Sequence, residues 1–140
     1  MQAQPYVFFD GKCEEALDFY KQALGAKVEM MMRYSENPDK PDPTKMPPNS
    51  ANKIMHAAFK VGDTQILASD GHCQGKPSFQ GFGLAISAAN DAEASKVFNA
   101  VGKGGQVMQP LAKTFFASSF GMVTDKFGVL WMVLAPTAMA

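Results

Sequence analysis

The sequence has little cysteine, and its cysteines are not clustered. Only two of the 140 residues are cysteines, Cys13 and Cys73, and they form neither a CxxC pair nor a cluster with the spacing of metal ligands. This excludes a disulfide scaffold and a zinc cluster of the usual kind. We expect two free thiols.

The chain also lacks an excess of charge of either sign and any long hydrophobic run. Thirteen acidic side chains balance 13 basic ones, a composition that argues against a nucleic-acid or anionic-membrane surface. No apolar run approaches the roughly 20 residues that span a membrane. The first residues, MQAQPYVFFDG, have no basic segment and too short an apolar stretch for a signal peptide. We therefore predict a cytoplasmic protein with no nucleic-acid and no membrane partner.

The sequence does contain an alternation of strand and helix patterns. Hydrophobic residues make up 46% of the chain, enough for one core, so residues 1–140 are expected to form a single domain. In the first half, helical spacing with Gly25 at its end predicts one helix, and Gly62 with Asp63 predicts a two-residue hairpin turn. A loop with five of the nine prolines separates these parts. The expected order is strand 5–9, helix 13–24, strand 26–34, loop 35–51, and strands 53–61 and 64–69.

The second half repeats this order. Asn90 or Asp91 is the expected N-cap of its helix, and EEALDFY superposes on AEASKVF, which indicates an internal duplication. The expected elements are strand 81–87, helix 90–105, strand 106–110 and a closing hairpin over 119–136. The fold class is therefore predicted to be α+β, with two β-α-β-β-β modules at about 1–75 and 76–140.

Three motifs carry a family resemblance: PYVFFDGKCEEALDFYKQALGAKV, MHAAFKVGDTQILASD and FGMVTDKFGVLWMV. In this order they resemble the PhnB-like branch of the vicinal oxygen chelate superfamily, which includes glyoxalase I, bleomycin-resistance proteins and extradiol dioxygenases. The resemblance implies an open cup of eight strands and a homodimer. Some members of the branch carry the label demethylubiquinone methyltransferase-like.

The resemblance also indicates which positions would bind a metal ion. Enzymes of the superfamily bind a divalent metal through His or Glu from the first and last strands of each module. Aligned with that pattern, the ligand positions fall near Pro5, Leu67, Gly83 and Met132, and none of these supplies a suitable donor. A shift of one residue adds only Tyr6 as an oxygen donor. We predict that the metal site is lost and that the protein uses no cofactor.

Strand alternation predicts which side chains line the cup. It places Leu84, Ile86, Val129, Trp131 and Val133 against the helix. The hairpin register sets His56 beside Ser69, because opposed residues share a face. The residues expected to face the cup are Val7, Phe9, His56, Gln65, Leu67, Ser69, Gly83, Ala85, Ser87, Leu130, Met132 and Leu134.

Several candidate site residues have two interpretations. His56 is the best candidate for a catalytic base, yet a lone histidine on a strand is commonly structural. Arg33 either holds an anionic ligand through a forked contact or is solvated. Phe116, next to Phe115, either closes the cup or joins a dimer interface.

Other residues have a mainly structural interpretation. Met30, Met31 and Met32 are expected to fill the core or a dimer contact, and Asp70 and Asp125 to act as local backbone caps. The predicted ligand-binding residues are Phe9, Arg33, His56, Gln65, Ser69, Ser87, Phe116 and Met132.

Three functions follow, and a structural or interaction role stays open beside them. The first is a small-molecule-binding protein that works without metal. The second is an enzyme of lyase or dioxygenase type, which needs an unusual metal site or His56 as a lone base. The third is a methyltransferase, disfavoured because the glycine-rich GKGG follows a helix where common S-adenosylmethionine enzymes place it after a strand.

Overall fold

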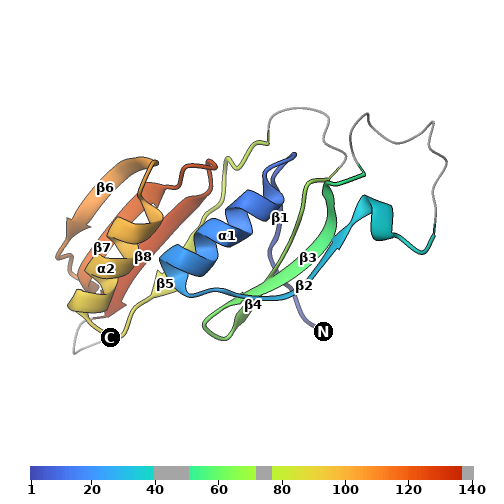
Figure 1. Cartoon of the computed structure of the whole chain (residues 1–140). Helices are drawn as coiled ribbons and strands as arrows, with labels where there is room; N and C mark the ends of the chain where they lie inside the picture. Colours follow the sequence, from blue (N-terminus) through green and yellow to red (C-terminus); the bar gives the residue numbers. More distant parts are fainter. Residues whose placement is uncertain (40–50, 72–76, 137–140) are drawn as a thin grey trace. The chain divides into compact units, whose positions relative to one another are not determined.

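The computed structural model describes residues 1–39, 51–71 and 77–136 (Figure 1). Its contacts divide the chain into two compact units, Met1–Pro77 and Ser78–Ala140, which we call module one and module two. Cys73 and residues 40–50 of the predicted proline-rich loop lie outside the described residues. No helix in the described part is long and apolar enough to cross a membrane.

Module one is a four-stranded sheet with one α-helix. The sheet order is β1-β4-β3-β2, with β1 parallel to β4 and the other pairs antiparallel. The predicted hairpin is confirmed with its register, since Lys60 lies opposite Gln65 and Val61 opposite Thr64. The elements are β1 (Tyr6–Phe8), α1 (Cys13–Leu24), β2 (Lys27–Arg33), the 3-10 helix η1 (Tyr34–Glu36), β3 (Ile54–Val61) and β4 (Thr64–Ser69).

Module two repeats this order, and its sheet runs β5-β8-β7-β6. The predicted cap is Asn90, whose side chain accepts a hydrogen bond from the Glu93 backbone N–H at 2.8 Å. The elements are β5 (Leu84–Ser87), α2 (Asp91–Val101), β6 (Gln106–Ala112), β7 (Ala117–Thr124) and β8 (Leu130–Pro136). The predicted α+β class with two similar β-α-β-β-β modules is confirmed.

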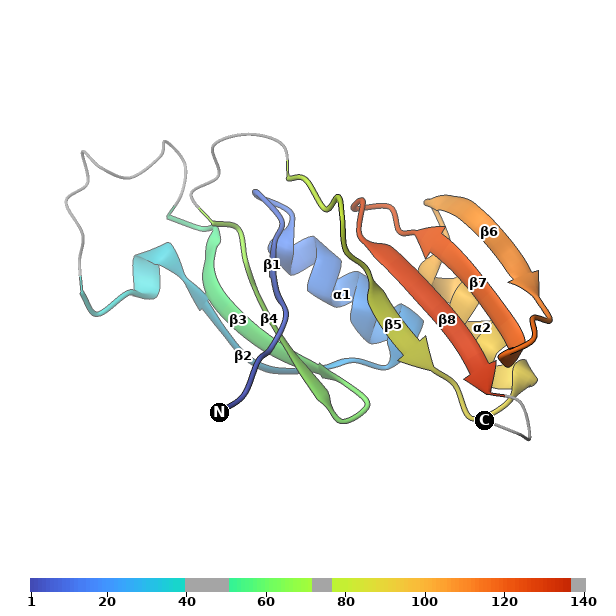
Figure 2. The same cartoon turned by 180° about the vertical axis from the view of Figure 1, so that it is seen from behind.

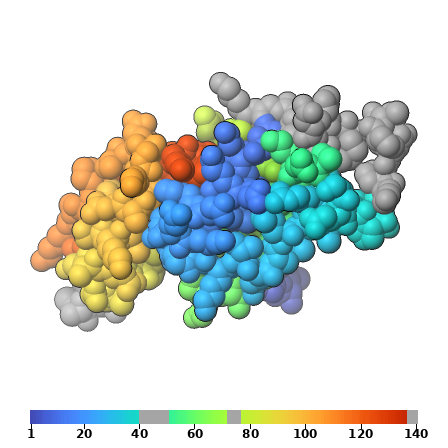
Figure 3. Space-filling model, viewed as in Figure 1, coloured from blue at the N-terminus to red at the C-terminus, as the bar shows by residue number. Residues whose placement is uncertain are grey.

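Each helix covers one face of its own sheet (Figures 1 and 2). In module one Tyr20 of α1 is buried, stacks on Phe59 of β3 with ring centroids 5.8 Å apart, and contacts the Phe9 ring at 6.2 Å. The space-filling view shows α1, in blue, on the outer surface of module one (Figure 3). We call the sheet face that points away from the helix of the same module its distal face.

The core of module two leaves no room for a side chain at one point of β7. A Cβ added to Gly121 would lie 2.8 Å from the Phe98 ring of α2 and 3.0 Å from the backbone of β6. Along β8 the predicted alternation is confirmed, because Val129, Trp131 and Val133 are buried while the residues between them are half-exposed.

The predicted orientation of β1 is wrong by one residue. Tyr6 lies opposite Leu67 and Phe8 opposite Ser69, so Tyr6 and Phe8 share the distal face with them. Val7 and Phe9 are each 1% exposed and belong to the core with α1. Alternation cannot choose between the two faces here, because all four residues from Tyr6 to Phe9 are apolar or aromatic.

Candidate functional site

The distal face of module one carries large apolar side chains that remain exposed. Tyr6 is 36% exposed, Phe8 54% and Met30 39%. The sheet register aligns further side chains on the same face. The residues of this face are Tyr6, Phe8, Lys27, Met30, Met32, His56, Ala58, Lys60, Gln65, Leu67 and Ser69.

An aromatic cluster on this face consists of Tyr6 and Phe8 of the edge strand β1 and His56 of β3. The rings of Tyr6 and Phe8 are 4.7 Å apart with a 31° tilt, and those of Tyr6 and His56 are 5.7 Å apart with a 35° tilt. The Tyr6 Oη and His56 Nδ1 atoms are 3.1 Å apart, within hydrogen-bond distance. Rings of this kind offer a flat apolar contact with polar groups at its edge.

A polar chain borders the cluster. Gln4 Nε2 donates to Gln65 Oε1 at 2.5 Å, and Gln65 Nε2 donates to Glu29 Oε1 at 2.7 Å. Lys60 Nζ lies 3.9 Å from Glu29 Oε2. The predicted site residue Gln65 is therefore on the expected face, with its carbonyl oxygen already paired.

Ser69 is on the predicted face but has a local role. Its Oγ accepts a hydrogen bond from the Gly71 backbone N–H at 3.0 Å, and the residue is 2% exposed. Gly71 has a positive φ of 61°, and a Cβ there would lie 3.2 Å from the Phe8 ring. Glycine at this position thus supports the turn and leaves room for the exposed Phe8 ring.

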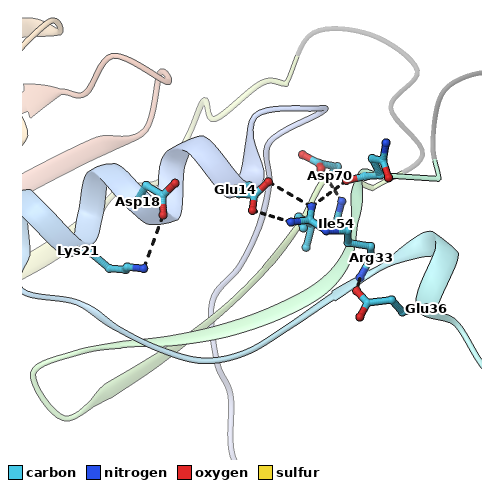
Figure 4. A network of polar contacts seen from close by, with 8 residues as sticks. Glu14, Asp18, Lys21, Arg33, Glu36, Ile54 and Asp70 are labelled. Carbon is cyan, nitrogen blue, oxygen red and sulfur yellow. Dashed lines mark hydrogen bonds and ion pairs between the residues drawn. The ribbon is translucent and has the colours of Figure 1, made fainter.

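Arg33 does not join this face. It lies opposite Ile54, and its guanidinium forms a forked contact with Glu14 of α1, at 2.7 and 3.2 Å, and donates to the Asn52 carbonyl oxygen at 3.0 Å (Figure 4). The hydrogen bond from Arg33 lowers the pKa of Glu14, and the same contact raises the pKa of Arg33. The forked contact that we considered for an anionic ligand is made within the chain, to Glu14.

The buried Asp70 carboxylate caps backbone groups as predicted, but these groups are not local, because they belong to segments far away in the sequence. Asp70 accepts from the backbone N–H groups of Gly11, Cys13 and Ile54 at 2.7 to 2.8 Å, and Figure 4 shows its contact with Ile54. The Cys13 thiol beside it is buried, and burial together with the Asp70 charge raises its pKa. Such a thiol is a poor nucleophile.

The distal face of module two is built differently. Its β5, β7 and β8 residues are Ala85, Ser87, Phe120, Met122, Thr124, Leu130, Met132 and Leu134, none of which titrates near neutral pH. The predicted site residues Ser87 and Met132 lie here, and the Phe116 ring contacts that of Phe120 at 5.1 Å. By equivalent register, Met132 occupies the position of Leu67, and Phe120 that of His56.

The predicted site residues are divided between the two distal faces and the core. His56, Gln65 and Ser69 share the face of module one, whereas Phe9 is in the core. Tyr6 and Phe8 are exposed members of the cluster that were not predicted as ligand-binding residues. The signal that identifies them is the parallel pairing of β1 with β4, which hydrophobic alternation does not reveal.

The metal implied by the resemblance does not fit these residues. The register places Tyr6, Leu67 and Met132 on the distal faces, whereas Gln4 and Pro5 precede β1 and Gly83 precedes β5. None is a carboxylate or an imidazole, the donors expected for such a site. Within the described part of the chain, no three His, Cys, Asp or Glu side chains are grouped so that they hold a metal ion.

Comparison with known proteins extends over nearly the whole chain. The family model described as 3-demethylubiquinone-9 3-methyltransferase matches residues 1–134. Protein YjdN of Escherichia coli K12 is 33% identical over 140 residues, which cover 95% of this chain and 94% of that protein. The crystal structure of PA1353 from Pseudomonas aeruginosa is 39% identical with a TM-score of 0.84, covering 97% and 98% of the two chains. The PhnB protein of Bacillus cereus has the same fold, with 23% identity, a TM-score of 0.79 and coverage of 96% and 99%.

Proposed function

Because the chain belongs to the PhnB-like branch of the vicinal oxygen chelate superfamily, and to the family described as 3-demethylubiquinone-9 3-methyltransferase, we propose that it is a small-molecule-binding protein that holds its ligand without a divalent metal. The proposed contact surface is the distal face of module one. The observation that carries the proposal is the exposed aromatic cluster of Tyr6, Phe8 and His56 on that face. For the protein as a whole, a cytoplasmic location, a homodimer and a single-domain organisation remain predictions.

The chemistry of this cluster favours a flat ligand. Two neighbouring rings expose apolar surface, and one imidazole supplies a polar group beside them, the mixture typical of small-molecule sites. A bicyclic aromatic of about 13 heavy atoms, bound at about 0.4 kcal/mol per atom, would have a Kd on the order of 0.1 mM. Such an affinity is measurable by NMR titration.

The two other functions have less support. The description of the family names a methyltransferase, but GKGG connects α2 to β6 and so follows a helix, not a strand. A metal-dependent lyase or dioxygenase needs donors that the aligned positions do not supply. We therefore propose ligand binding alone.

The experiment is an NMR titration of ¹⁵N-labelled protein, treated with EDTA, with naphthalene compounds as probes. We expect amide shifts in β1, β3 and β4, and a Phe8→Ala variant with about tenfold weaker binding, because Phe8 supplies exposed ring surface. Phe115→Ala is the matched control, since Phe115 is a phenylalanine of module two that is 97% exposed. Binding that is unchanged by Phe8→Ala, or that requires added divalent metal, contradicts the proposal.

A further inference from the structure

We propose that the ligand carries a hydrogen-bond-accepting oxygen at the edge of its ring, and that it is an aromatic carboxylate bound by the Nε2–H group of His56. This inference rests on the proposed function, because it names the ligand class for the same face. It depends on three features of that face: the state of His56, the pairing of the nearby acceptors and the surrounding charge.

The first feature is the contact between Tyr6 and His56. Of the two groups, the phenol is the better donor and the imidazole nitrogen the better acceptor, so we assign Tyr6 Oη as the donor to Nδ1 in the neutral pair. This places the imidazole proton on Nε2. When the imidazole is protonated, both nitrogens carry protons and Nδ1 donates to Tyr6. In both of these states Nε2–H is a donor, and a ligand that covers it and displaces its water leaves it unpaired unless the ligand supplies an acceptor.

The second feature is the pairing of acceptors along the border of the face. Gln65 Oε1 accepts from Gln4, and the Glu29 carboxylate accepts from Gln65 and lies near Lys60. A donor group on the ligand would share these oxygens with the groups that already donate to them, whereas an acceptor on the ligand meets the Nε2–H group of His56. The cost of leaving a polar group unpaired on binding favours a ligand with an acceptor.

The third feature is the charge farther along the same face, where Lys60 is four residues from His56 on β3. Lys27 and Lys60 lie opposite each other on β2 and β3, on the same face as His56, and Glu29 is the carboxylate beside them. On the other elements of the sheet, Tyr6 is the titratable neighbour on β1, and Gln65, Leu67 and Ser69 of β4 are uncharged. Two ammonium groups against one carboxylate favour an anionic ligand over a cationic one.

The two modules differ at the place where Tyr6 and His56 form the donor pair. Phe120 occupies in module two the register position that His56 occupies in module one, and Ala85 that of Tyr6. Module two therefore lacks the donor pair at the equivalent place. The acid group of the ligand is assigned to module one for this reason.

The experiment compares three probes that share one ring system: 2-naphthoate, 2-naphthamide and 2-naphthylmethylamine. Affinities are measured by NMR titration at constant ionic strength with the wild type, His56→Phe and Lys60→Met. We expect the wild type to bind naphthoate most tightly and the amine most weakly. His56→Phe keeps a ring but removes the donor, and it should weaken naphthoate binding about tenfold. It should weaken naphthamide binding less, because the amide oxygen is uncharged, and leave amine binding nearly unchanged. Lys60→Met should weaken it less than threefold, because a solvated charge contributes little.

The outcomes separate this inference from the proposed function. If all three probes bind equally well, or if His56→Phe leaves the preference for naphthoate unchanged, the inference is overturned while ligand binding stands. If Lys60→Met abolishes the preference for naphthoate, Lys60 binds the carboxylate and the inference is overturned. If no probe binds to a wild type with a native ¹⁵N spectrum, both are overturned. Thermal unfolding of each variant controls for loss of the fold.

Discussion

Removal of the Asp125 carboxylate should destabilise module two strongly. Asp125 is 2% exposed and follows β7, where Oδ1 accepts from the backbone N–H groups of Phe127 at 2.8 Å and Val129 at 3.1 Å. Its Oδ2 accepts from Trp131 Nε1 at 2.8 Å. One side chain therefore holds the turn and orients the buried indole of β8.

The magnitude follows from the donors that Asp125→Ala would leave without this acceptor. The N–H groups of Val129 and Trp131 are buried, and each costs about 1–3 kcal/mol when unpaired, whereas water reaches the half-buried N–H of Phe127. We expect a loss of about 3–4 kcal/mol in the free energy of unfolding. Asp125→Asn should cost about 2 kcal/mol, because the amide keeps one acceptor oxygen and turns an NH₂ group toward a donor.

The assay is urea unfolding followed by tryptophan fluorescence. Trp131 is the single tryptophan of the chain, so its emission reports on module two alone, and far-UV circular dichroism follows both modules. Lys126→Ala, at an exposed position in the same turn, is the control and should change the free energy of unfolding by less than about 1 kcal/mol, because its Nζ lies 5.3 Å from the centre of the Phe127 ring in an exposed cation–π contact. A loss below about 1 kcal/mol in Asp125→Ala would refute this account of the turn.

Three further predictions concern other parts of the molecule. Because Arg33 lowers the pKa of Glu14 in the folded state, their contact should stabilise the protein above the ordinary glutamate pKa and lose this effect as the pH falls through the lowered value. The effect on the free energy of unfolding is small, since both groups are partly exposed. Urea unfolding measured over a pH series should show it in the wild type and not in Glu14→Gln, and the same pH dependence in both proteins would contradict this. In a Cys73→Ser variant, iodoacetamide should label Cys13 only on unfolding, because burial and the adjacent carboxylate raise the thiol pKa; rapid labelling of the native protein, read by mass spectrometry, would be inconsistent with this. Gly121→Ala should cost about 1–3 kcal/mol, because the added methyl lies 2.8 Å from a ring of α2, and an unchanged thermal midpoint would show that the helix shifts freely.

The sequence predicted those parts of the fold that local chemistry determines. Gly62 with Asp63 fixes a two-residue turn, and the turn fixes the register that aligns His56 with the distal face. The period-two parity also predicted that Trp131 lies on the buried side of β8, although residues 129–135 are all apolar.

The remaining features depend on tertiary contacts. Tyr6 and Phe8 are as hydrophobic as their buried neighbours, so only pairing with β4 determines which of them face outward. Arg33 finds its carboxylate partner on α1, and no spacing rule relates these two positions. The sequence shows the chemical type of these side chains but not which residues they contact in the fold.

The proposed function requires that a flat ligand bind the aromatic cluster of module one in the absence of metal. The most direct measurement is a residue-by-residue map of amide shifts when metal-stripped protein is titrated with 2-naphthoate. Our account predicts saturable shifts concentrated around Tyr6, Phe8 and His56, unaltered by added Mg²⁺ or Zn²⁺. Shifts confined to module two, or shifts that develop only after a divalent cation is supplied, would contradict it.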